Sequence, residues 1–358
     1  MTFDVSLKAW LALSLTRGLG GESARRLLKE FGSPDAVFAA SISSLKSVVK
    51  ADIAAEISKG IADDVIAPAL AWLEDGNNHI VTLADSDYPQ ALLNIPDPPL
   101  LLYVKGRLDL LNRSALAIVG SRSATPQGIN NAEAFAKSLS DAGLCIISGM
   151  AHGIDAAAHR GALRGQGSSI AVVGTGLDKV YPAANRDLAH ALAQQGALIS
   201  EFPLGTPPLA ANFPRRNRLI SGMSLGCLVV EASLQSGSLI TARLALEQGR
   251  DVFAIPGSIH APQSKGCHAL LKQGAKLVET AQDILEELGG LLVSPAQGAN
   301  SGGPDSALLE HLGFDPVDVD TLSVRCGLTI AELSAMLLTL ELNGRICVLP
   351  GGLYQRIH

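Results

Sequence analysis

The chain has 358 residues, a formal net charge of −6 and a pI near 5.8. Apolar residues make up 47% of it, charged residues 17% and aromatic residues 4%, which excludes a disordered or fibrous protein and allows a large buried core. At about 100–200 residues per domain, we expect two or three domains.

Residues 1–70 are predicted to form a small helical domain. Apolar residues recur at helical spacing through Leu7, Leu11 and Leu15, and RGLGGESARRLL (17–28) then places a glycine turn between two helices. This is the pattern of a helix-hairpin-helix (SAM-like) module, in which the backbone N–H groups of the turn can face a phosphate. The region has eight basic and eight acidic residues, however, so a purely structural pair of helices is favoured.

Residues 71–290 are predicted to form a doubly wound α/β domain. Six short apolar runs are each followed by a loop and by helix-forming sequence, and they occupy 115–120, 144–149, 169–174, 197–202, 227–232 and 251–257. Near-continuous apolar strands indicate a sheet buried on both faces, and their alternation with helices indicates right-handed βαβ units. Ligands of such sheets bind beyond the carboxyl ends of the strands, so the loops after these runs are the candidate sites.

The loop after the first run, GSRSATPQG (120–128), has groups that can bind an anion. Gly120 permits a tight turn, Ser121 offers a hydroxyl, and the Arg122 guanidinium can form paired hydrogen bonds with a phosphate. A helix predicted to begin near Pro126 points its positive end at the same place. By itself, this stretch would be an ordinary strand-to-helix turn.

The next two loops carry weaker signals. His152 and His159 are seven residues apart, which is not the i, i+4 spacing of a metal-binding pair, so we expect them to pack and to form local hydrogen bonds. The loop GTGLDKVYPAANR (174–186) supplies Lys179 and Arg186. Its G-x-G lacks the third glycine of the dinucleotide-binding fingerprint, which makes a dinucleotide-binding protein the least favoured class.

The stretch NFPRRNR (212–218) concentrates positive charge in an acidic chain. Pro214 is predicted to stand at the first position of a helix. The arginines of its first turn are Arg215, Arg216 and Arg218. Cations at a helix N-terminus oppose the helix dipole by about 0.3–1 kcal/mol each, and an external anion would reverse that sign. We therefore interpret the stretch as a phosphate site; alternatively, some of these arginines pair with Glu201 or Glu231 and serve the scaffold.

The loops after the fifth and sixth runs add hydroxyl and basic groups. EASLQSGSLITARL (231–244) leads into a helix, and its start is predicted to offer backbone N–H and hydroxyl donors. These candidate donors are Ser236, Gly237, Ser238 and Thr241. Lys265 stands before a further predicted helix and is a candidate for the same surface.

The C-terminal part is predicted to be a separate domain. Residues 291–304 form a polar linker containing Gly and Pro, and 305–358 read as three helices followed by a hairpin at LPGGLY (349–354), a winged-helix-like pattern. Winged helices often bind duplex DNA, which requires a basic surface. Here three arginines face seven acidic residues, so we predict a protein-interaction or regulatory domain.

The sequence lacks the common signs of catalysis, of metal binding and of membrane insertion. We find no Ser–His–Asp order with a nucleophile elbow, no metal triad and no C-x-x-C among the five cysteines, so no catalytic residue, metal or cofactor is predicted. No apolar stretch reaches about 18 residues and the N-terminus does not resemble a signal peptide, so we expect a cytoplasmic protein without a membrane span.

Six of these stretches in order resemble the DNA-processing protein A family (DprA, also called Smf). The match is dense from about 115 to 280 and includes GSRSATPQG, SGMAHGIDAAAHRGAL, NFPRRNRLISGMS and SGSLITARLALEQG. The resemblance implies an extended Rossmann-like domain that binds single-stranded DNA without sequence preference and is not an enzyme. It also implies a homodimer that protects incoming DNA during natural transformation and helps to load the RecA recombinase.

The resemblance also assigns DNA-binding positions. They are Gly120, Ser121, Arg122, Asn212, Phe213, Arg215, Arg216, Arg218, Ser236, Gly237, Ser238 and Thr241. Some relatives carry a lysine after the Tyr-Pro of the third loop, where this chain has Ala183, so Lys179 or Arg186 would have to compensate. The alternative is an enzyme similar to the Rossmann-like nucleotide phosphoribohydrolases, with Glu201 or Glu231 as the catalytic acid.

Overall fold

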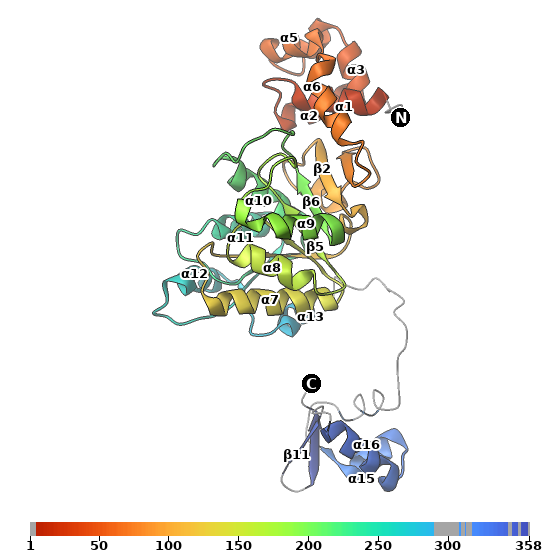
Figure 1. The fold of residues 1–358 in the computed structure, drawn as a ribbon, viewed down its shortest axis with the longest axis vertical. Coiled ribbons are helices and arrows are strands. Elements are labelled where there is room, and N and C mark those ends of the chain that lie inside the picture. The colour runs from red at the N-terminus through yellow and green to blue at the C-terminus, as the bar shows by residue number, and fades with distance from the viewer. Residues whose placement is uncertain are drawn as a thin grey trace. The chain divides into compact units, whose positions relative to one another are not determined.

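The computed structural model describes residues 5–289, Leu308, Leu312, 317–342, 346–349 and 352–356. The chain forms two compact units, Met1–Val293 and Ser294–His358 (Figure 1). The predicted boundary between 70 and 71 stays a prediction, because both sides of it belong to the first unit. The predicted linker 291–304 lies outside the described residues.

Helices at the start of the chain pack around their own apolar cluster. They are α1 (Val5–Leu15), α2 (Gly21–Phe31), α3 (Pro34–Ala39), α4 (Ile42–Lys46), α5 (Ala51–Lys59) and α6 (Asp63–Trp72). Trp10, Leu27 and Val37 are buried in this cluster, which also includes Leu100 of the following domain. The predicted helix, glycine turn and helix over 5–31 are therefore confirmed, and Gly18 adopts a left-handed φ of 80° in the turn.

A nine-stranded sheet forms the centre of the first unit, within residues 5–289. Its strands are β1 (Asn78–Thr82), β2 (Leu101–Gly106), β3 (Ala115–Val119), β4 (Cys145–Ser148), β5 (Ser169–Val172), β6 (Ala197–Ser200), β7 (Gly226–Val229), β8 (Asp251–Ala254) and β9 (Lys276–Leu277). The order is β1-β2-β6-β5-β4-β3-β7-β8-β9, and β3 to β9 are parallel. The six predicted strands are confirmed, whereas the antiparallel pair β1–β2 and the short edge strand β9 were not predicted. The order reverses between β3 and β7, which is the switch point of a doubly wound sheet.

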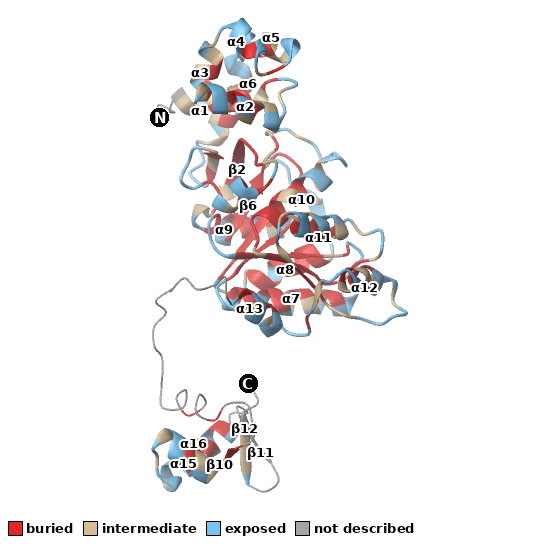
Figure 2. Ribbon diagram, turned by 180° about the vertical axis from the view of Figure 1, so that it is seen from behind, coloured by how far each residue is buried: buried red, intermediate tan, exposed pale blue. Residues whose placement is uncertain are grey.

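Helices cover both faces of the sheet. The helices α7 (Pro126–Asp141), α8 (Ile154–Ala162) and α13 (Ala281–Leu288) pack on one face, and α10 (Asn212–Gly222), α11 (Ser238–Glu247) and α12 (Lys265–Lys272) pack on the other. The helix α9 (Arg186–Gln195) packs beside β6. Figure 2 shows buried strands between helices with exposed outer sides, and this confirms the predicted doubly wound α/β architecture.

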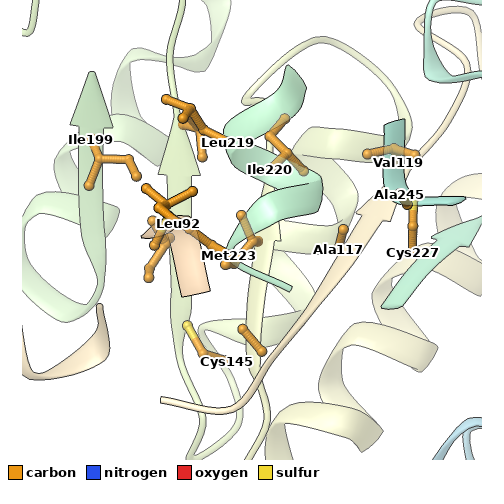
Figure 3. Close-up of a cluster of buried hydrophobic side chains, with 14 of the residues drawn as sticks. Leu92, Ala117, Val119, Cys145, Ile199, Leu219, Ile220, Met223, Cys227 and Ala245 are labelled. Atoms are coloured by element: carbon orange, nitrogen blue, oxygen red, sulfur yellow. The ribbon is translucent and has the colours of Figure 1, made fainter. Parts of the chain in front are cut away.

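Helix α10 is anchored to the sheet by its apolar side chains. Leu219 and Ile220, together with Met223 directly after the helix, are buried among residues of β3, β6 and β7 (Figure 3). The helix begins at Asn212, so the prediction that Pro214 is its first residue is wrong by two positions. Proline is tolerated there because the first N–H groups of a helix have no partner within the helix.

Histidine 159 is buried in α8, as its predicted packing role requires, whereas His152 is exposed and the packing predicted for it is wrong. Its Nδ1 lies 2.7 Å from Ser169 Oγ, and burial lowers its pKa to about 3, with the charges of Arg216 and Arg160 acting in the same direction. Within the described residues, no three His, Cys, Asp or Glu side chains gather as a metal site would require.

Acidification should therefore destabilise the fold through His159. The unfolded chain binds a proton near pH 6.5 and the folded chain does so only near pH 3, so stability falls as pH decreases through this window. When the pH is lowered from 7.5 to 5.5, His159 should reduce the free energy of unfolding by about 1.4 kcal/mol. Urea unfolding at both pH values should show a smaller pH effect in His159→Gln. A pH effect in His159→Gln as large as that of the unsubstituted protein would contradict the assignment.

The second unit has a winged-helix arrangement. It contains β10 (Val317–Asp318), α15 (Val319–Cys326), α16 (Ile330–Leu342), β11 (Ile346–Leu349) and β12 (Leu353–Arg356), with the strand order β10-β12-β11. The predicted hairpin is confirmed, and β10 was not predicted. The first predicted helix, 307–313, lies outside the described residues except for Leu308 and Leu312, which are buried.

None of the helices in the described parts of the chain has the length and apolarity needed to cross a membrane.

Candidate functional site

A cleft of about 610 Å³ opens at the switch point of the sheet. Its walls come from the loop after β3, from the start of α10 and from the segment between β7 and α11. The predicted site residues that line it are Gly120, Ser121, Arg122, Phe213, Arg216, Ser236, Gly237, Ser238 and Thr241. Three loops that are far apart in the sequence therefore meet in one concave surface, where ligands of such sheets bind.

The rim of the cleft carries an arginine and two aromatic rings. Arg122 is exposed, and its guanidinium carbon lies 5.8 Å from the centre of the Phe213 ring. The rings of Tyr181 and Phe213 are 5.6 Å apart and inclined by 38°. No carboxylate of residues 5–289 lies within 4 Å of the Arg122 guanidinium, so its charge is available to an anion.

The floor of the cleft holds two buried ionisable side chains, Arg216 and Asp155. Arg216 is only 4% exposed; it donates hydrogen bonds to the carbonyls of Gly149 (2.8 Å) and Val172, which follow β4 and end β5. Burial lowers the pKa of Arg216 to about 10, an effect that the nearby Asp155 opposes. Burial raises the pKa of Asp155, and Arg216 opposes that shift. Arg216 therefore ties two strand ends together beneath the cleft.

The other two arginines of α10 face away from this cleft. Arg218 forms two hydrogen bonds with Glu201, of 3.0 and 2.7 Å, and Arg215 forms one of 3.3 Å with the same carboxylate. The Nε of Arg218 also lies 3.5 Å from Asp97. The alternative of scaffold pairing with Glu201 is therefore confirmed for Arg215 and Arg218. Neither of them lines the cleft beside Arg216, and their assignment to DNA binding stays a prediction. Their helical spacing separates them, because residues 213, 216, 217 and 220 share one face of α10.

Glutamate 231 serves the start of α7. Its carboxylate accepts hydrogen bonds from Thr125 N (2.9 Å) and Thr125 Oγ1 (2.5 Å), and Thr125 in turn caps the helix through Gly128 N. The helix begins at Pro126, as predicted. Neither Glu231 nor Glu201 lines the cleft, so neither is placed to act as the catalytic acid of a nucleotide hydrolase there.

The start of α11 contributes hydroxyl groups. Ser236 Oγ and Ser238 Oγ are 2.7 Å apart, and α11 has no side-chain N-cap. The N–H group of Ser236 donates to the carbonyl of Ser233, and the N–H group of Ser238 donates to Ser236 Oγ. The prediction of free backbone donors at this helix start is therefore wrong at these two positions, and the hydroxyls remain.

Glycine 120 has a packing role in the cleft wall. A Cβ there would lie 2.6 Å from Cγ1 of Ile154, so only glycine lets the loop after β3 rest against α8. Glycine at this position is therefore needed for close packing against α8 as well as for the predicted tight turn.

Four further predicted residues lie outside the lining of the cleft. Asn212 donates a hydrogen bond of 3.0 Å to the carbonyl of Gly174 and so fixes the start of α10. Lys179, Arg186 and Lys265 are exposed and form no ion pair with any residue of 5–289. Lys179 stands two positions before Tyr181, which lines the cleft.

The lining residues that the sequence interpretation missed include Tyr181, Asn217 and Gln263. Asn217 could have been found from the helical spacing that also places Phe213 in the wall. Gln263 donates a hydrogen bond of 3.2 Å to the carbonyl of Ser123, a contact between distant loops for which the sequence gives no local signal.

Two family models match this chain. Residues 79–289 match the model described as DNA recombination-mediator protein A, and residues 293–352 match the DprA winged helix domain. Protein Smf of Escherichia coli is 47% identical over 82% of this chain and 81% of its own length. DNA processing protein DprA of Streptococcus pneumoniae is 48% identical over 58% of this chain and 73% of its own length.

Solved structures are similar over the same regions. The X-ray structure of DprA from Streptococcus pneumoniae has a TM-score of 0.70 and 37% identity, over 80% of this chain and 99% of that one. The Helicobacter pylori protein, whose structure is described in terms of its single-stranded DNA binding mode, has a TM-score of 0.54 and 31% identity, over 59% of this chain and 96% of that one. With a family model that covers more than half of its length and a relative 47% identical over most of both sequences, this chain belongs to the DprA/Smf family of DNA recombination-mediator proteins.

Proposed function

We propose that the cleft binds single-stranded DNA without sequence preference. The observation that carries this proposal is the exposed Arg122 guanidinium, which has no acidic partner among residues 5–289 and lies beside the rings of Phe213 and Tyr181. An unpaired guanidinium can hold a phosphate, and aromatic faces can stack on any base. The described DNA-binding mode of the Helicobacter pylori relative supports the same ligand.

We further propose that the protein acts in the cytoplasm as a homodimer that protects incoming DNA during natural transformation and helps to load the RecA recombinase. The description of its family as recombination mediators supports this role over an enzymatic one. The engagement of Glu201 and Glu231 in structural hydrogen bonds also speaks against a hydrolase. The acidic winged-helix unit suits a protein contact better than duplex DNA.

Titration of the full chain with single-stranded and duplex oligonucleotides at several salt concentrations tests the DNA-binding proposal. Single strands of different sequence should bind with similar affinity and at least about tenfold more tightly than the duplex, because a stacked duplex cannot present its base faces to the rings. Each phosphate contact should add about −0.7 to the slope of log K against log salt. Equal binding of duplex, or binding that is independent of salt, would reject the proposal.

A further inference from the structure

We propose that the cleft accommodates one whole nucleotide, so that free deoxynucleoside monophosphates occupy it and compete with DNA. This inference rests on the proposed function and specifies which part of the strand enters the cleft. Its volume, about 610 Å³, lies in the range of about 300–1,000 Å³ that is typical of small-molecule sites. A surface that only followed phosphates would not need such depth.

One part of the cleft is suited to a base. Phe213, Tyr181 and Ile240 contribute apolar surface to the lining, and the residues Tyr181 and Ile240 remain 46% and 38% exposed. In the free protein one partner of the Phe213 ring is the Arg122 guanidinium, 5.8 Å from the ring centre. A planar base can take this place, because both a cation and a base bind the face of an aromatic ring.

The charges of the floor and the rim set the orientation of the nucleotide. Asp155 and Arg216 are buried in the floor, and a phosphate there would meet the Asp155 carboxylate away from water. The edge of a base carries both donors and acceptors and can face this pair. The rim offers the Arg122 guanidinium and the hydroxyls of Ser236 and Ser238 to the phosphate.

Binding of the nucleotide therefore moves Arg122 from one partner to another. The guanidinium leaves the Phe213 ring and pairs with the phosphate, while the base takes the vacated ring face. Binding of the base and binding of the phosphate depend on each other, because the base must displace the Arg122 guanidinium from the Phe213 ring and the phosphate must bind that guanidinium. A nucleoside alone and inorganic phosphate alone should each bind poorly.

Calorimetric titration of the full chain with thymidine 5′-monophosphate tests this inference without DNA. The nucleotide should bind at least about tenfold more tightly than thymidine or inorganic phosphate at constant ionic strength. The nucleotide should also displace a fluorescein-labelled oligothymidine at a concentration about tenfold lower than thymidine or inorganic phosphate requires. Phe213→Leu should weaken nucleotide binding about tenfold, whereas Phe38→Leu, at a half-buried phenylalanine of α3, should leave nucleotide binding unchanged.

Nucleotide binding no tighter than that of inorganic phosphate would overturn the inference. If the oligonucleotide still binds in a salt-dependent way that Arg122→Ala weakens, the proposed function stands and only the single-nucleotide pocket fails. If the Arg122 substitution affects neither ligand, the cleft itself is excluded as the DNA site.

Discussion

Replacing Arg122 by alanine should weaken binding of single-stranded DNA about tenfold to a hundredfold at low salt. Arg122 is the exposed guanidinium of the cleft lining, and a hydrogen bond to a charged group contributes about 1.5–3 kcal/mol, with 1.4 kcal/mol corresponding to tenfold in affinity. The slope of log K against log salt should become less steep by about 0.7, because one phosphate contact is lost. Fluorescence anisotropy at four salt concentrations measures both quantities.

Lys137→Ala is the matched control for this substitution. Lys137 is a half-exposed cation of α7, which packs on the face of the sheet opposite to α10 and α11. Its side chain pairs with Asp141 at 2.6 Å. Both substitutions change the net charge by the same amount, so only a local contact can distinguish them. Equal affinity losses in the two variants would attribute binding to net charge and contradict the site. Arg216→Ala would be a poor substitute, because it removes a buried tie between β4 and β5.

Replacing Glu201 by alanine should reduce the free energy of unfolding by about 3 kcal/mol. The Glu201 and Arg218 side chains are 4% and 12% exposed, so the substitution leaves a largely buried guanidinium whose one remaining acidic partner within residues 5–289 is Asp97, at 3.5 Å. Asp97 also pairs with Arg25 of α2 at 2.8 Å, so the change weakens the connection between the first helices and the sheet. Urea unfolding followed by circular dichroism gives the free energy.

Asp109→Ala provides the comparison for Glu201. Asp109 also bridges two arginines, Arg107 at 2.7 Å and Arg113 at 2.8 Å, but its side chain is 51% exposed. Solvent screens such a pair, so the loss of unfolding free energy should stay below about 1 kcal/mol. A loss of similar size in both variants would show that burial does not decide the strength of the Glu201 network.

The strands of the sheet could be predicted because their signal is local. Runs such as 115–119 and 226–229 are apolar throughout, since both of their faces are covered by helices. The pair β1–β2 was missed although β2 is almost wholly buried, because the two strands are joined by a short 3-10 helix and no α-helix that would suggest a βαβ unit. The reversal of strand order between β3 and β7 depends on pairing between distant segments, which the sequence pattern does not specify.

The candidate site was predicted only in part, for two different reasons. The division of α10 into a cleft face with Arg216 and an opposite face with Arg215 and Arg218 follows from the 3.6-residue period and could have been predicted. The burial of Arg216 and the pairing of Glu201 with Arg218 depend on tertiary packing. Charge density alone therefore identified a helix that lines the cleft, but it did not indicate that only Arg216 of its three arginines belongs to the lining.

Photocross-linking locates a bound strand directly. Oligothymidines carrying one 5-iodouracil at successive positions can be bound to the full chain, irradiated, and the attached peptides identified by mass spectrometry. Binding in the cleft predicts cross-links at Tyr181 or Phe213, the rings beside Arg122. Cross-links confined to α1–α6 or to residues 294–358 would contradict the assignment of the cleft as the site for single-stranded DNA.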